Sequence, residues 1–150
     1  MIEHPTRSAI SEAQVVTQLR TVMTEWTVRI NKQDTAWFDG LLSHDFTYTS
    51  HPHFPLVMKK GVFLDLLKNV SDQVMEIRDV RAQVVGNIAI VTIVAKCLAE
   101  SFRANLGPGF PSPEEIEKSL LGRSVVYGFG WRILETGWQL FDQHLYEIVD

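Results

Sequence analysis

The sequence predicts an α+β fold, a cone-shaped roll in which three N-terminal helices pack on a curved, mainly antiparallel sheet. Helical periodicity dominates the first half of the chain, where one strand lies among the helices. From residue 74 onward, β-branched residues and tight turns predict four long antiparallel strands instead. No linker or repeat separates the two halves, so we expect residues 1–150 to form a single domain.

The first helix is predicted to begin after Ser11, which precedes Gln14 with the spacing of a capping box. Its apolar residues recur every three or four positions and share one face: Val15, Leu19, Val22, Trp26 and Ile30. The segment NKQD ends this pattern, and Asp34 or Thr35 can cap a short second helix. A third helix is predicted for GVFLDLLKNV at 61–70, because its apolar residues again have helical spacing.

The strands are predicted from alternation and from the turn residues between them. The first, DFTYTSHP, alternates polar and aromatic residues, stops at a proline and places Phe46, Tyr48 and Ser50 on one side. The later strands are EIRDVRAQVV at 76–85, IAIVTIVAKCLAESF at 88–102, RSVVYGFGWRIL at 123–134 and WQLFDQHLYEIV at 138–149. In the second of these, alternation predicts that the following residues face inward: Val91, Ile93, Ala95 and Cys97. The segment 103–122 is interpreted as a loop that carries one short helix.

Composition and charge limit the classes of function. Hydrophobic residues make up 45% of the chain and charged residues 21%, which is typical of a soluble globular domain. The net charge of −4 provides no basic stripe, so neither nucleic acid nor an anionic membrane surface is expected as a partner. The single cysteine, Cys97, cannot form an intrachain disulfide, and the first residues do not have the pattern of a secretory signal. A cytoplasmic protein is therefore expected.

Five parts of the sequence together resemble the nuclear transport factor 2-like superfamily, which includes ketosteroid isomerases and SnoaL-like polyketide cyclases. They are Trp26, NKQD at 31–34, LLSHDFTYTSHP at 41–52, MKKGVFLDLL at 58–67 and GWQLFDQH at 137–144. The resemblance covers nearly the whole chain. It implies the cone-shaped fold, a homodimer formed through the outer face of the sheet, and an active site inside the cone in those members that have one. It does not imply one reaction, because a fold hosts many functions.

The resemblance to the steroid isomerases does not extend to their catalytic residues. With NKQD as the anchor, Trp26 occupies the position of their oxyanion-hole tyrosine and Ser50 that of their proton-transferring aspartate. Their buried, protonated aspartate corresponds to the region 127–131, which contains no carboxylate. Because a serine without an adjacent base cannot remove a proton from carbon, steroid isomerisation by that arrangement is not expected.

The stretch TSHPHFP contains two histidines beside the position of the family's base. His51 or His53 can act as a general base at the mouth of the cone, since histidine titrates closest to neutral pH. The alternative is a solvated strand end without a catalytic role. A metal site would need a third ligand such as Asp45 or His144, and no spacing in the sequence fixes one, so we expect neither a metal nor another cofactor.

The last strand supplies two further candidates. Strict alternation places Trp138, Leu140, Asp142 and His144 on one side, and the apolar pair predicts that this side faces the cavity. A carboxylate two residues from an imidazole can orient it for proton transfer. Alternatively, Asp142 and His144 belong to a structural polar network with Arg123 or Tyr127.

These residues lead to three hypotheses about function. The first is a SnoaL-like enzyme of isomerase, cyclase or dehydratase type that acts on a small apolar or partly polar ligand. Proton transfer would then involve His51, His53, Asp142 and His144, and the pocket would be formed by Trp26, Tyr48, Ser50, Tyr127 and Trp131. The second is a non-catalytic small-molecule-binding protein, and the third is a dimeric protein-interaction module.

Overall fold

The computed structural model describes residues 11–52, 56–103 and 109–149. Its helices are α1 (Glu12–Asn31), α2 (Thr35–Leu41), α3 (Lys60–Asn69) and α4 (Pro113–Leu120). Its strands are β1 (Leu42–Ser50), β2 (Leu56–Lys59), β3 (Val70–Val85), β4 (Ile88–Phe102), β5 (Ser124–Leu134) and β6 (Gly137–Val149). They form a sheet in the order β2-β1-β6-β5-β4-β3, in which β1 and β6 pair in parallel and the other neighbours pair antiparallel.

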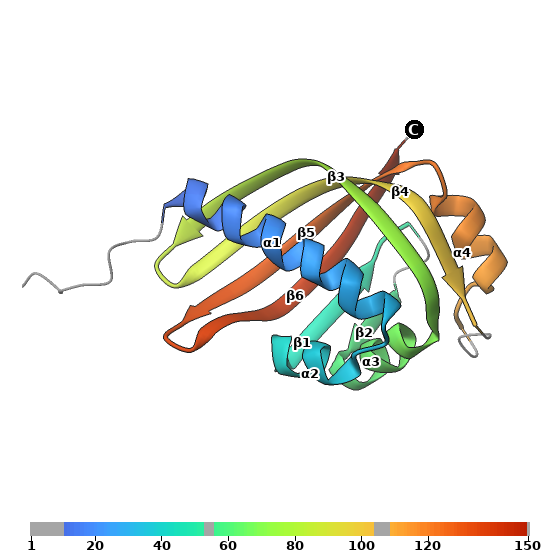
Figure 1. Ribbon diagram of the computed structural model, residues 1–150, viewed down its shortest axis with the longest axis horizontal. Coiled ribbons are helices and arrows are strands. Elements are labelled where there is room, and N and C mark those ends of the chain that lie inside the picture. Colours follow the sequence, from blue (N-terminus) through green and yellow to red (C-terminus); the bar gives the residue numbers. More distant parts are fainter. Residues whose placement is uncertain (1–10, 53–55, 104–108, 150) are drawn as a thin grey trace, which may run out of the picture.

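The predicted α+β roll is confirmed. The sheet is strongly curved, α1 lies across its hollow side, and α2 and α3 lie near β1 and β2 (Figure 1). The short helix predicted between the strands is α4, which Ser112 caps and Pro113 begins. One strand was missed by the sequence prediction: β2 has only four residues, which is too short for a period to be recognised.

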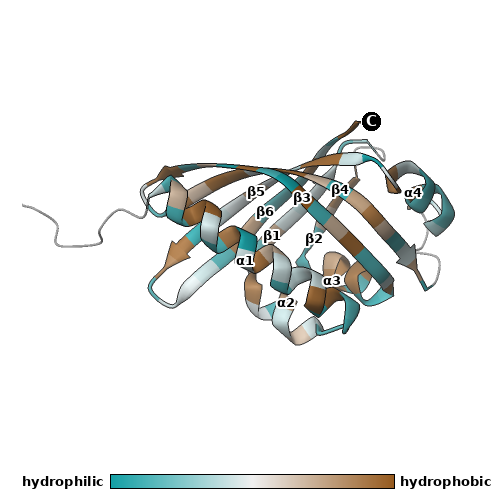
Figure 2. Ribbon diagram, turned by 45° about the horizontal axis from the view of Figure 1, so that its top comes forward, coloured by the Kyte–Doolittle hydropathy of each residue, from teal (hydrophilic) through white to brown (hydrophobic). Residues whose placement is uncertain are grey.

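The core lies between α1 and the concave face of the sheet. The predicted face of α1 is largely buried, and so is the predicted inward side of β4. The buried residues of these two faces are Val15, Leu19, Trp26, Ile30, Val91, Ile93, Ala95 and Cys97. Figure 2 shows the resulting alternation of apolar and polar segments along β3 and β4, because successive side chains of a strand point to opposite faces.

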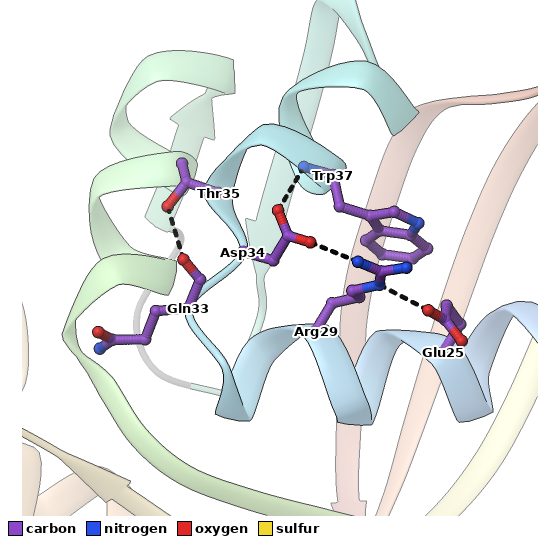
Figure 3. Close-up of polar contacts among 6 residues, drawn as sticks. All are labelled: Glu25, Arg29, Gln33, Asp34, Thr35 and Trp37. Carbon is purple, nitrogen blue, oxygen red and sulfur yellow. Dashed lines mark hydrogen bonds and ion pairs between the residues drawn. The ribbon is translucent and has the colours of Figure 1, made fainter.

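The segment NKQD forms the corner between α1 and α2 (Figure 3). Gln33 has a φ of 58°, in the left-handed region, which turns the chain sharply after α1. Asp34 then caps α2 by accepting a hydrogen bond from the backbone N–H of Trp37 at 3.1 Å. Arg29 donates to the carboxylates of Glu25 and Asp34, so it ties the last turns of α1 to the residue that caps α2.

Two of the register shifts in the sheet decide which polar side chains face the core. On β4, Cys97 pairs with Met75 and Ala99 pairs with Val74, so Leu98 is an extra residue. On β6, Leu140 pairs with Trp131 and Asp142 pairs with Gly130, so Phe141 is an extra residue. One extra residue moves the side chains that follow it, as far as the next bulge, to the opposite face. The bulges therefore turn Glu100 and Gln143 toward the concave side.

Candidate functional site

A cavity of about 110 Å³ lies inside the cone. An engineered apolar cavity of about 150 Å³ binds benzene, so this smaller cavity suits a small organic ligand. Its walls are largely aromatic and aliphatic and include Trp26, Met58, Phe63, Leu67 and Phe129. Its polar lining consists of Tyr48, Ser50, Gln73, Glu100, Tyr127 and Gln143. Among the described residues, no lysine, arginine or histidine lines it.

Glu100 is the acidic residue of the cavity wall among the residues that the structure describes, and only 9% of it is exposed. The amide Nε2 of Gln73 donates to both of its carboxylate oxygens, at 3.0 and 3.3 Å. Burial raises the pKa of Glu100 to about 7, which the hydrogen bond from Gln73 opposes and the negative charges of Glu117 and Asp72 reinforce. Both protonation states of Glu100 are therefore populated near neutral pH, as a general acid–base group requires.

Two tyrosines bring phenol groups to the same cavity. Tyr48 stacks on Phe63, with ring centroids 5.1 Å apart, and Tyr127 lies on β5 beside Phe129. Burial raises the pKa of Tyr48, and the charge of Glu100 raises it further, while a hydrogen bond with Ser50 opposes this shift. Burial also raises the pKa of Tyr127 well above its ordinary value. Both phenols therefore stay protonated and can donate a hydrogen bond to a ligand.

Gln143 lies on the floor of the cavity, between two aromatic neighbours. Its strand, β6, is flanked by β1 and β5, and Gln143 pairs with Tyr48 on one side and Phe129 on the other. Only 5% of the residue is exposed. Its carbonyl oxygen Oε1 is buried and has no hydrogen-bond partner among the described residues. A buried carbonyl without a partner is uncommon, because its desolvation is then uncompensated.

His51, Asp142 and His144 converge, but they do so outside the cavity. Nε2 of His51 lies 3.0 Å from Nδ1 of His144, and Nε2 of His144 lies 3.0 Å from Oδ2 of Asp142. Thr47 donates to the other oxygen of Asp142 at 3.1 Å. Tyr146 extends the group, since its ring is stacked with both imidazoles.

The expectation that Asp142 and His144 face the cavity is wrong. They follow the bulge at Phe141, so Gln143 and Leu145 point inward instead. The network suggested with Arg123 or Tyr127 also differs, because the observed partners of Asp142 and His144 are Thr47 and His51.

Four of the five predicted pocket residues lie in the cavity wall: Trp26, Tyr48, Ser50 and Tyr127. Trp131 does not, because it is fully buried between Phe129 and Trp138 in the core. His53 lies outside the described residues. Sequence reasoning missed Glu100 and Gln143. A lone acidic residue in the apolar strand 88–102 was the available signal for Glu100, but alternation assigned it to the outer face.

Asp45, the suggested third metal ligand, is engaged elsewhere. Arg132 donates to its two carboxylate oxygens at 3.0 and 2.9 Å, and these bonds hold the pKa of Asp45 well below its usual range. Within the described residues, no group of three or more histidine, cysteine or acidic side chains is arranged to hold a metal ion. In the same part of the chain, no helix has the length and apolar character needed to span a membrane.

Neither a family model nor a curated protein sequence matches the chain. Solved structures do resemble it. A nuclear transport factor 2-like protein from Cytophaga hutchinsonii has a TM-score of 0.65 at 9% identity, over 89% of this chain and 96% of that one. A superfamily protein from Salmonella enterica has a TM-score of 0.64 at 11% identity, over 93% and 95%. A Streptomyces avermitilis protein of this family, provisionally named a dehydratase, has a TM-score of 0.62 at 19% identity, over 89% and 96%.

Proposed function

We propose that this chain, which has the nuclear transport factor 2-like fold, is an enzyme that isomerises or dehydrates a small, neutral organic molecule by proton transfer. Glu100 is the general acid–base group of this proposal. The observation that carries it is a carboxyl group with a pKa of about 7 in the wall of an apolar cavity. Such a carboxyl can both accept and return a proton at neutral pH.

A carbonyl compound fits the other polar groups of the cavity. The Glu100 carboxylate would remove a proton from the carbon next to the carbonyl, and the negative charge would develop on the carbonyl oxygen. Tyr48 and Tyr127 are neutral donors suited to stabilise that oxygen. Returning the proton to another carbon completes an isomerisation, whereas giving it to a leaving hydroxide releases water and completes a dehydration.

Two features favour a neutral substrate. No cationic side chain among the described residues lines the cavity, so a carboxylate or phosphate would be buried there without a counter-ion. Glu117 and Asp72 add negative charge near Glu100, which disfavours an anion further. The provisional dehydratase name of the Streptomyces avermitilis protein is compatible with a reaction that releases water.

The test uses cyclohexanone, which is a small neutral carbonyl compound. Exchange of the hydrogens next to its carbonyl for deuterium in D₂O is followed by NMR. We expect the wild-type protein to accelerate the exchange, with a rate that rises through about pH 7 as Glu100 becomes ionised. Glu100→Gln should lose the acceleration, whereas Glu76→Gln, on the exposed side of β3, should keep it.

Unaccelerated exchange in the wild-type protein, or equal acceleration by Glu100→Gln, would reject the enzyme. Saturable binding of cyclohexanone without exchange would support the alternative of a non-catalytic binding protein. His51, Asp142 and His144 are not part of the proposed reaction, because none of them lines the cavity.

We also propose a homodimer formed through the convex face of the sheet. Three large apolar or aromatic side chains on β4 and β6 support it, because they are exposed on that face: Ile90, Leu98 and Tyr146. Light scattering coupled to gel filtration should give twice the chain mass for the wild-type protein and a monomer for Leu98→Glu. Val62→Glu, at an equally exposed site on α3, should stay dimeric. A wild-type monomer would reject the proposal.

A further inference from the structure

We propose that Asn31 is a positioning residue for Glu100 and that it acts through Gln73. The inference deepens the proposed function and rests on it in one respect, because Glu100 is taken to be the general acid–base group. Asn31 is the last residue of α1 and does not line the cavity. Its side chain reaches β3 instead, where it binds the residue that hydrogen-bonds to Glu100.

The side chain of Asn31 holds the backbone of Gln73 at two points. Its Oδ1 accepts from the backbone N–H of Gln73 at 2.9 Å, and its Nδ2 donates to the carbonyl oxygen of Gln73, also at 2.9 Å. The same Nδ2 donates to the carbonyl oxygen of Thr27 at 2.8 Å, which fixes the amide group on α1. Asparagine suits this position because its side chain combines an acceptor with two donor hydrogens.

The part of β3 that contains Gln73 needs an anchor outside the strand pairing. β3 is at the edge of the sheet, so β4 is its one neighbouring strand. Between two register shifts, the two strands stay in register over Asp72–Ser101, Gln73–Glu100 and Val74–Ala99. So short a segment receives little register information from the rest of the ladder. Asn31 provides the outer hydrogen-bond partner that an edge strand lacks, and it thereby fixes the segment relative to α1.

This anchoring determines how Gln73 meets Glu100, its direct partner on β4. The backbone groups of Gln73 are directed outward to Asn31, as in the antiparallel pairs whose facing side chains come closest. Nε2 of Gln73 then reaches both carboxylate oxygens of Glu100, at 3.0 and 3.3 Å. A donor on a carboxylate favours its ionised form, so the bond keeps Glu100 able to accept a proton near neutral pH. Without Asn31, Gln73 would hold this position less well and Glu100 would ionise at higher pH.

The test measures the pH at which Glu100 is half ionised, from the ¹³C shift of its carboxyl carbon. The signal is identified by its absence in Glu100→Gln. Gln73→Met keeps the length of the side chain without its donor, and it should raise the midpoint by about one pH unit. Asn31→Ala should raise the midpoint in the same direction, by no more than Gln73→Met does. Asn31→Leu, which nearly keeps the volume of the side chain, should give the same result as Asn31→Ala.

The decisive measurement is the double variant Asn31→Ala with Gln73→Met. Because Asn31 acts through Gln73, the double variant should titrate within about 0.3 pH unit of Gln73→Met alone. Asn69→Ala is the matched control and should titrate as the wild type, since Asn69 also ends a helix but donates within it, to Asp65 at 3.2 Å. The other titratable groups near Glu100 are unchanged in every variant: Tyr48, Asp72, Cys97, Glu117 and Tyr127.

Wild-type midpoints in Asn31→Ala and Asn31→Leu, or a double variant whose shift is the sum of the two single shifts, would overturn the inference. Because the ¹³C titration needs no activity, it separates this inference from the proposed reaction. If the midpoints move as expected but cyclohexanone exchange is not accelerated, the reaction fails and the positioning role stands. If exchange is accelerated but Asn31→Ala leaves the midpoint unchanged, the reaction stands and the positioning role fails.

Discussion

Replacing Glu100 by glutamine should remove a pH dependence of stability that this one residue creates. The pKa of Glu100 is raised from 4.5 to about 7 in the native protein, mainly because the carboxyl group is buried. The native state therefore holds the proton more tightly than the unfolded chain. Its stabilisation is complete below pH 4.5 and is lost as the pH rises through about 7.

The size of the effect follows from the two pKa values. At about 1.4 kcal/mol per pH unit, the whole difference corresponds to about 3 kcal/mol of unfolding free energy. Most of it, about 2.5 kcal/mol, is lost between pH 5 and pH 8, because Glu100 is mainly protonated in the native state at pH 5 and mainly ionised at pH 8. Screening by solvent is small, since only 9% of the residue is exposed.

Urea denaturation at pH 5, 6, 7 and 8 measures this effect. The difference in unfolding free energy between Glu100→Gln and the wild-type protein should grow in favour of the variant by about 2.5 kcal/mol from pH 5 to pH 8. Glu76→Gln, at an exposed position on β3, serves as the control, and its unfolding free energy should change with pH nearly as that of the wild type does. If the unfolding free energies of Glu100→Gln and the wild-type protein changed equally with pH, the raised pKa of Glu100 would be refuted, and with it the basis of the proposed catalytic role.

Two further predictions concern the convex face. Gly128→Ala should lower the unfolding free energy by about 1–2 kcal/mol, because a Cβ at this position would overlap the ring of Tyr146. Measured by urea denaturation, Gly128→Ala should lower the unfolding free energy less in a protein that also carries Tyr146→Ala. An equal loss in both backgrounds would mean that the Tyr146 ring does not obstruct the added Cβ. His144→Ala should leave deuterium exchange of cyclohexanone within about twofold of wild type, because the imidazole lies on the face opposite the cavity. A loss as large as that of Glu100→Gln would place the His51 and His144 pair in the reaction.

The sequence predicted most elements of the fold because their signals are local. Ser11 and Gln14 do form a capping box, and the apolar face predicted for the first helix is buried on α1. Ser112 and Pro113 begin α4 as expected from their order in the chain. Tyr48 and Ser50 share the inner side of β1, because no bulge interrupts β1 between them. Each of these features depends on residues within a few positions of one another.

The alternation of side chains predicted the wrong face where a bulge in the strand pairing interrupts it. Cys97 faces inward as predicted, yet Glu100, three positions later, is also buried on the concave side. Leu140 faces inward as well, and Gln143 follows it inward at the same spacing. In both strands one extra residue, Leu98 or Phe141, is accommodated by a bulge against the neighbouring strand.

The sequence by itself determined the fold class, the helix boundaries and the aromatic character of the cavity, since periodicity and capping residues encode them directly. Only the tertiary structure decided which polar groups enter the cavity and which meet on the convex face. The physical reason is that side chains of a strand alternate with a period of two, so a single unpaired residue exchanges the two faces. Whether a strand takes such a bulge depends on its register with a distant partner strand. That register put Glu100 and Gln143 inside, and it brought His144 to His51 outside.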